Sequence, residues 1–160
     1  MGFSWSASSI ERMAGLHPDL VKVLNAFAPV SPLDCVIAQG CRTAEQEMAL
    51  WLKCHNQDGT RNDEPWLTNC NGYPIGVLAP NGIQGTGISN HQGGYAVDLG
   101  VIIGGVYTGT LGYYHTIAGV LLPLAATLGV HMVYGGAWQP PKTDSDHFEL
   151  DRKVYPAITA

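Results

Sequence analysis

Two short polar motifs, about fifty residues apart, contain the side chains best suited to chemistry. They span residues 89–98 and 144–150 and offer two imidazoles, His91 and His147, and one carboxylate, Asp98. Three protein ligands of these types hold a catalytic zinc ion and leave one position open for water, whereas four ligands close a structural zinc site. The sequence therefore predicts a catalytic metal centre built from two distant segments.

Two glycines follow His91 in the first motif. Gly93 and Gly94 allow the backbone to turn tightly, so that the next strand can bring Asp98 back beside the imidazole. His147 must then come from a neighbouring strand, whose apolar residues anchor it in the core. We therefore expect rigid ligand positions.

The N-terminal segment predicts two helices. Ser8 or Ser9 can cap the first helix, and Gly15 ends it. Pro18 suits the first position of the second helix, in which apolar residues recur at helical spacing as far as Phe27.

The remaining elements alternate between strands and helices. We expect strands at residues 35–38, 95–99, 131–134 and 147–150, and helices from Thr43 to Trp51 and at residues 113–128. Residues 56–88 are rich in Asn, Asp, Gly and Pro and predict a long loop region. A regular βαβ alternation is missing, so we expect one α+β domain over residues 1–160, with a small antiparallel sheet flanked by helices.

Charge and hydropathy exclude several partners. The formal net charge is −5, and no run of lysines and arginines supplies the basic surface that nucleic acids require. The most apolar stretch, residues 117–130, is too short to span a membrane and contains Pro123. The N-terminal residues have no apolar signal segment, so we expect synthesis in a cytoplasm without a signal peptide and no membrane insertion.

The four cysteines are spaced too irregularly for a zinc finger or ribbon. We interpret Cys35, Cys41, Cys54 and Cys70 as small buried thiols. A disulfide from Cys54 to Cys41 or Cys70 stays an alternative, as does a second zinc site that uses His55. The histidines without a partner at ligand spacing receive no functional role; they are His17, His55, His115 and His131.

The two motifs also resemble those of a known family. The first matches the pattern S-x-H-x-x-G-x-A-V-D, and the second matches D/E-x-x-H. Further similarity covers residues 15–20, 40–46 and 135–138. The chain resembles the M15 peptidases, which include D-Ala-D-Ala carboxypeptidases, dipeptidases and phage L-alanyl-D-glutamate endolysins. The element at residues 15–20 resembles the endolysin branch.

This resemblance implies a D-Ala-D-Ala carboxypeptidase/Hedgehog-like fold with zinc on the sheet. It implies that His91, Asp98 and His147 bind Zn²⁺ and that Asp144 is the general base. A carboxylate at that spacing can take a proton from a zinc-activated water and return it to the leaving amine. Asp146 is the rival base, but a residue next to His147 on a strand points to the opposite face.

Four residues are expected to contact substrate by the same resemblance; they are Arg42, Gln46, Ser89 and Trp138. Arg42 would bind substrate or stabilise the developing oxyanion, although an arginine at this position can also be a surface or ion-paired residue. The chain departs from the family pattern at Tyr134 and Ala137, which replace the usual Trp and Asp, and in the length of residues 56–88. These departures concern recognition and leave the ligand set intact.

By resemblance, the leading hypothesis is a zinc-dependent L-alanyl-D-glutamate endopeptidase that cleaves the peptide of bacterial peptidoglycan. It would be a monomeric phage or prophage endolysin that acts on the cell wall after release, through a holin-type pore protein. One alternative is a D-Ala-D-Ala carboxypeptidase or dipeptidase, which needs a cation for the terminal carboxylate of its substrate. Another is a noncatalytic zinc-containing wall-binding or virion protein.

Overall fold

A small antiparallel sheet covered by helices makes up the described part of the protein. The computed structural model describes residues 2–51, 89–139 and 143–155. Its five strands follow the order β1-β2-β5-β4, and β3 also pairs with β2. Every pairing is antiparallel, which confirms the α+β class predicted from the sequence.

The predicted elements are present within a few residues of their expected bounds. The strands are β1 (Asp34–Gln39), β2 (Ala96–Ile103), β3 (Val106–Thr108), β4 (Met132–Tyr134) and β5 (His147–Leu150). The helices are α1 (Ala7–Arg12), α2 (Pro18–Phe27), α3 (Ala44–Trp51) and α4 (Leu111–Thr127), with 3-10 turns at Ala28–Val30 and Gly135–Ala137. The predicted loop region at 56–88 lies outside the described residues.

The first helix differs from its prediction at both ends. Ser6, rather than Ser8 or Ser9, is the N-cap, and its hydroxyl accepts a hydrogen bond from the Ser9 backbone N–H. Ser9 is buried instead, and its hydroxyl accepts from the backbone N–H of Ile37 on β1 at 3.1 Å. The helix ends at Arg12, ahead of Gly15. The cap prediction was wrong because Ser9 serves a contact distant in the sequence.

A short hairpin was missed by the sequence analysis. β3 follows β2 after Gly104 and Gly105, whose φ values of 60° and 80° suit the two-residue turn of a right-twisted hairpin. A pair of glycines between apolar residues is the signal that could have predicted it.

None of the described helices combines the length and apolar character needed to cross a lipid bilayer.

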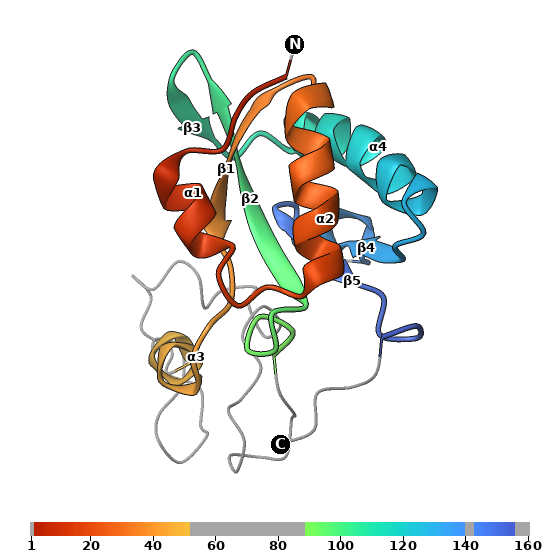
Figure 1. The fold of residues 1–160 in the computed structure, drawn as a ribbon. Coiled ribbons are helices and arrows are strands. Elements are labelled where there is room, and N and C mark those ends of the chain that lie inside the picture. Colours follow the sequence, from red (N-terminus) through yellow and green to blue (C-terminus); the bar gives the residue numbers. More distant parts are fainter. Residues whose placement is uncertain (1, 52–88, 140–142, 156–160) are drawn as a thin grey trace.

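The core lies between the sheet and the helices α2 and α4, which pack together (Figure 1). Alternate residues of β2, including Val97 and Leu99, are fully buried in this core, as are Phe148 and Leu150 of β5. Because side chains alternate along a strand, the residues between them project from the other face of the sheet. That face receives the polar residues of both motifs.

Candidate metal centre

Adjacent strands position two of the predicted ligands. Asp98 on β2 and His147 on β5 are direct partners in the register of the sheet. Their strand neighbours Val97 and Phe148 point into the core, so both ligand side chains project from the opposite face. The carboxylate and the imidazole therefore face the same space.

A tight turn ahead of β2 positions His91. The Gln92 N–H donates to the Ser89 carbonyl at 3.0 Å, and the Gly94 N–H donates to the His91 carbonyl at 3.1 Å. Gly94 has a φ of 73°, in the left-handed region that favours glycine. The same His91 carbonyl accepts from the Arg42 N–H at 3.0 Å, which ties the turn to the segment after β1.

We predict that Gly94→Ala destabilises the protein strongly. A Cβ atom at this position would overlap the Gly15 carbonyl oxygen. The left-handed backbone alone costs a non-glycine residue about 1–3 kcal/mol, and the overlap adds to that cost. Chemical denaturation measures the loss, with Gly119→Ala on α4 as control, because nothing lies within 4 Å of its added Cβ. Equal unfolding free energies for the two variants would contradict the prediction.

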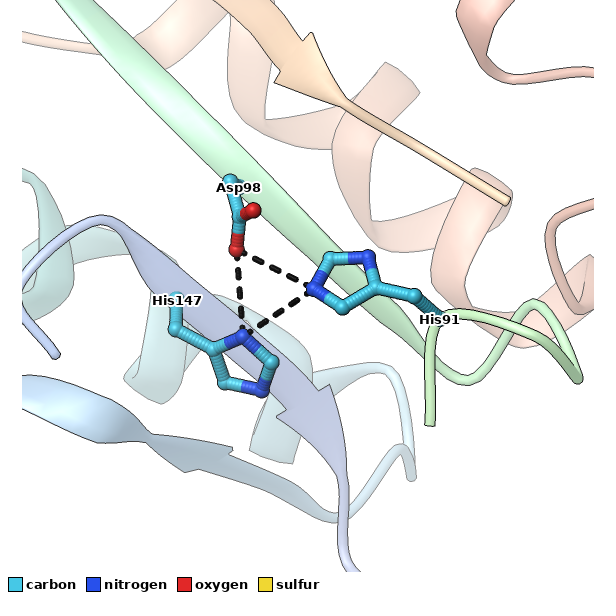
Figure 2. A group of neighbouring side chains, drawn as sticks. All are labelled: His91, Asp98 and His147. Carbon is cyan, nitrogen blue, oxygen red and sulfur yellow. Dashed lines mark hydrogen bonds and ion pairs between the residues drawn. The ribbon is translucent and has the colours of Figure 1, made fainter. Parts of the chain in front are cut away.

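The three predicted ligands converge on one point (Figure 2). His91 Nε2 lies 3.2 Å from His147 Nδ1 and 3.2 Å from Asp98 Oδ1, and the last two atoms are 3.1 Å apart. A tetrahedral zinc ion with bonds of about 2.0–2.1 Å holds its ligand atoms about 3.3 Å from one another. The triangle therefore has the size that a single zinc ion requires.

The outer ring nitrogens explain why the inner ones are free to bind a cation. His91 Nδ1 lies 2.9 Å from the Gly40 carbonyl, to which its N–H can donate. His147 Nε2 lies 3.0 Å from Glu149 Oε2 and can donate likewise. In these tautomers the inner nitrogens and Asp98 Oδ1 present three lone pairs to one point, which repel one another unless a positive charge lies between them.

Contacts within the cluster also shift the pKa values of Asp98 and His147. Burial raises the pKa of Asp98, but hydrogen bonds with the rings of His147 and His91 outweigh it and hold that pKa well below its usual range. Burial lowers the pKa of His147, but its contacts with Asp98 and Glu149 outweigh burial and raise that pKa well above its usual range. The cluster thus attracts a positive charge, either a proton or a metal ion.

Arg42 lies beside this cluster as a largely buried, ion-paired residue. One terminal nitrogen is 3.3 Å from Asp98 Oδ2, and the other is 3.2 Å from Glu47 Oε2. The Arg42 side chain is 10% exposed and that of Glu47 is fully buried. Among the described residues, Arg42 Nε and Glu47 Oε1 have no hydrogen-bond partner. Of the two interpretations from the sequence, the structure shows the ion pair, and the contact with substrate stays a prediction.

We predict that Glu47→Ala lowers the free energy of unfolding by about 3 kcal/mol, because it leaves the buried Arg42 guanidinium with one carboxylate in place of two. Chemical denaturation of the metal-free protein measures this loss. Glu45→Ala, on the exposed side of α3, is the matched control and should cost far less. Equal losses in the two variants would contradict the buried pair.

The other predicted substrate residues have different surroundings. Gln46 and Thr43 form a reciprocal cap on α3, with side chain to backbone hydrogen bonds of 2.9 and 3.2 Å. Ser89 is buried, and its hydroxyl accepts from the His91 N–H at 3.3 Å. Trp138 is half-buried with its ring centroid 5.2 Å from that of His147. Of these three residues, Trp138 places an aromatic ring next to the cluster, and contact with substrate stays a prediction for all three.

Asp144 and Asp146 both lie in the turn that leads into β5. The Asp144 carbonyl accepts from the His147 N–H at 3.4 Å, and the Asp146 carbonyl accepts from the Leu99 N–H at 2.9 Å. Burial raises the pKa of Asp146, and a side-chain hydrogen bond with Asp144 raises it further. The two carboxyl groups are therefore neighbours, and the choice of Asp144 as the base stays a prediction.

Two partners of the ligands were not found from the sequence. Glu149 follows His147 by two residues, and this spacing on a strand places both side chains on one face. That signal was available and could have indicated Glu149. The contact of His91 with the Gly40 carbonyl could not be predicted. Every residue has a backbone carbonyl, and the fold alone determines which one lies beside His91.

Cys35, Cys41 and His17 lie in the described part of the chain and outside the His-Asp-His cluster. Cys35 and Cys41 are free, and burial raises the pKa of Cys35 to about 12. His17 caps α2, because its Nδ1 accepts from the Asp19 N–H at 3.2 Å. The alternatives that used Cys54, His55 and Cys70, including the disulfide from Cys54 to Cys41, lie outside the described residues.

The antiparallel sheet and its His-Asp-His cluster are similar to the fold and the metal site of M15-type zinc peptidases. The structure is similar to that of the Serratia marcescens L-Ala D-Glu endopeptidase ChiX, with a TM-score of 0.70 and 26% sequence identity. This similarity covers 96% of this chain and 95% of that chain. It confirms the resemblance and the fold inferred from the sequence motifs.

A second solved structure is also similar. It is the vancomycin resistance D,D-pentapeptidase VanY from a VanB-type resistance cassette, solved as a mutant in complex with Zn(II). The identity is 17%, the TM-score is 0.49, and the match covers 83% of this chain and 68% of that chain. No family model matches the chain, and no curated protein sequence is significantly similar to it.

Proposed function

We propose that the protein is a zinc endopeptidase that cleaves the L-alanyl-D-glutamate bond in the stem peptide of bacterial peptidoglycan. The observation that carries this proposal is the similarity to an L-Ala D-Glu endopeptidase over nearly the whole of both chains, together with the converging His-Asp-His cluster. The same cluster on an unrelated fold would suggest a hydrolase without indicating its substrate.

Five polar residues in and beside the cluster have a role in the proposal. His91, Asp98 and His147 hold the zinc ion, which when bound makes water acidic, with a pKa of about 7. Asp144 accepts the proton of the attacking water and returns it to the amine that leaves. Arg42 maintains the orientation of Asp98 through its 3.3 Å contact with Oδ2.

The ion pairs of Arg42 favour an endopeptidase over a carboxypeptidase. An enzyme that removes a terminal residue needs a cationic group to receive the free carboxylate of its substrate. The guanidinium of Arg42 already contacts two carboxylates, those of Asp98 and Glu47, so its charge is compensated. An internal peptide bond makes no such demand on the site.

Mass spectrometry of purified muropeptides tests the proposal. Digestion should release a peptide that begins with D-glutamate and leave L-alanine on the muramyl group, and a zinc chelator should abolish the cleavage. Loss of a single terminal D-alanine would instead identify a D,D-carboxypeptidase. A folded, zinc-loaded protein that cleaves neither bond would support the noncatalytic alternative.

We also propose a biological role for this activity. A monomeric phage or prophage endolysin, made in the host cytoplasm, would reach the wall only after a pore protein opens the membrane. Expression in bacteria with and without a co-expressed holin tests this part: lysis should require the holin. Lysis at equal rates in both cultures would contradict it.

A further inference from the structure

Two residues outside the ligand set connect the segments that carry the two histidines. Glu149, on β5, is two residues beyond His147, and its Oε2 accepts from His147 Nε2 at 3.0 Å. The same oxygen accepts a hydrogen bond from the side-chain amide of Asn90. Asn90 is the residue directly before His91. One side-chain hydrogen bond thus joins the two histidine segments from outside the cluster.

The Asn90 side chain is itself held at its other end. Its carbonyl oxygen accepts from Arg152 Nε, and its backbone carbonyl accepts from the Tyr95 N–H at 2.8 Å. The side chain of Glu149 is only 14% exposed, so its contacts are shielded from water. A hydrogen bond to a charged, shielded acceptor is stronger than one between neutral groups in water.

This connection matters because the histidines differ in how they are supported. His147 lies on a strand of the sheet, whereas His91 lies in the turn before β2, where no sheet pairing holds it. Asp98 is fixed to His147 by the register of the strands. The ligand whose position needs additional support is therefore His91, and the Asn90 contact supports the residue next to it.

We propose that Glu149 and Asn90 form a brace that sets the two histidines for metal binding. Glu149 fixes the tautomer of His147 that leaves Nδ1 free as a ligand, and its charge makes that nitrogen a stronger donor. Asn90 holds the His91 turn against β5. Both act as positioning residues, and the inference rests on the proposed role of the cluster as a zinc site.

Zinc affinity tests the brace without reference to activity. The protein is titrated with Zn²⁺ in competition with a chromophoric chelator at fixed pH. Loss of an outer partner of a ligand weakens metal binding about 10-fold to 100-fold, and we expect Glu149→Ala to lie in this range. Asn90→Ala should have a smaller effect, because the His147 contact with Glu149 remains.

Two further variants separate positioning from general stability. Glu149→Gln retains an acceptor for His147 without the charge, so it should recover part of the affinity that Glu149→Ala loses. Asp151→Asn removes a nearby acidic charge, whose carboxylate caps the Lys153 N–H, and should bind zinc as the unaltered protein does. The visible spectrum of the Co²⁺-substituted protein should change in the Glu149 variants and stay constant in Asp151→Asn.

The results distinguish a failure of the proposed function from a failure of the brace. If the unaltered protein binds no zinc, the proposed function fails. If it binds zinc and Glu149→Ala binds with equal affinity and an equal Co²⁺ spectrum, only the brace is overturned. Should Glu149→Ala fail to fold, Glu149→Gln decides: weaker zinc binding with a changed spectrum supports the brace, and unchanged values overturn it.

Discussion

An Asp144→Asn variant should retain its zinc and its fold while kcat on muropeptides falls about 100-fold to 10,000-fold. This is the range that a positioned general base contributes, because an asparagine side chain cannot accept the proton of the attacking water. Metal analysis and circular dichroism, measured beside the kinetics, show whether the loss is chemical.

Asp146→Asn is the matched control for this experiment. It removes a carboxylate from the same turn, two residues away, and should reduce kcat far less. The reverse pattern, an active Asp144→Asn variant and an inactive Asp146→Asn variant, would transfer the role of base to Asp146.

A His91→Ala variant should lose both its zinc and its activity. The site has three donor atoms that lie 3.1–3.2 Å from one another. The variant retains two of them, and two donors cannot surround the ion. The loss of affinity should exceed the factor of about 10–100 that removal of an outer partner costs. Metal content after dialysis measures it.

His131→Ala controls for the loss of an imidazole as such. This side chain is exposed on the surface at the start of the segment leading into β4. The His131→Ala variant should retain one zinc ion per chain and full activity. Retention of zinc in His91→Ala would show that another residue completes the site.

The face on which the strand ligands Asp98 and His147 lie could be predicted, because alternation along a strand depends on local sequence. In β5, Phe148 and Leu150 are apolar and enter the core, so His147 must project from the other face. The pairing of His147 with Asp98 could not be predicted, since strand register depends on the whole sheet. The family motifs supplied that pairing, and the structure confirms that the side chains converge.

Burial and contacts that form only in the folded chain explain most of what the sequence did not predict. Ser9 suits a cap, but the Ile37 N–H recruits its hydroxyl once β1 lies beside α1. Glu47 looks like an ordinary charged residue in the first turn of a helix, yet it is fully buried against Arg42. Neither contact is encoded by spacing alone, because the partners meet only in the folded chain.

Anomalous X-ray diffraction at the zinc absorption edge tests the proposed zinc site most directly. We expect one peak per chain, within bonding distance of His91 Nε2, Asp98 Oδ1 and His147 Nδ1. A peak elsewhere, or crystals grown with excess zinc that show no peak at this position, would contradict it.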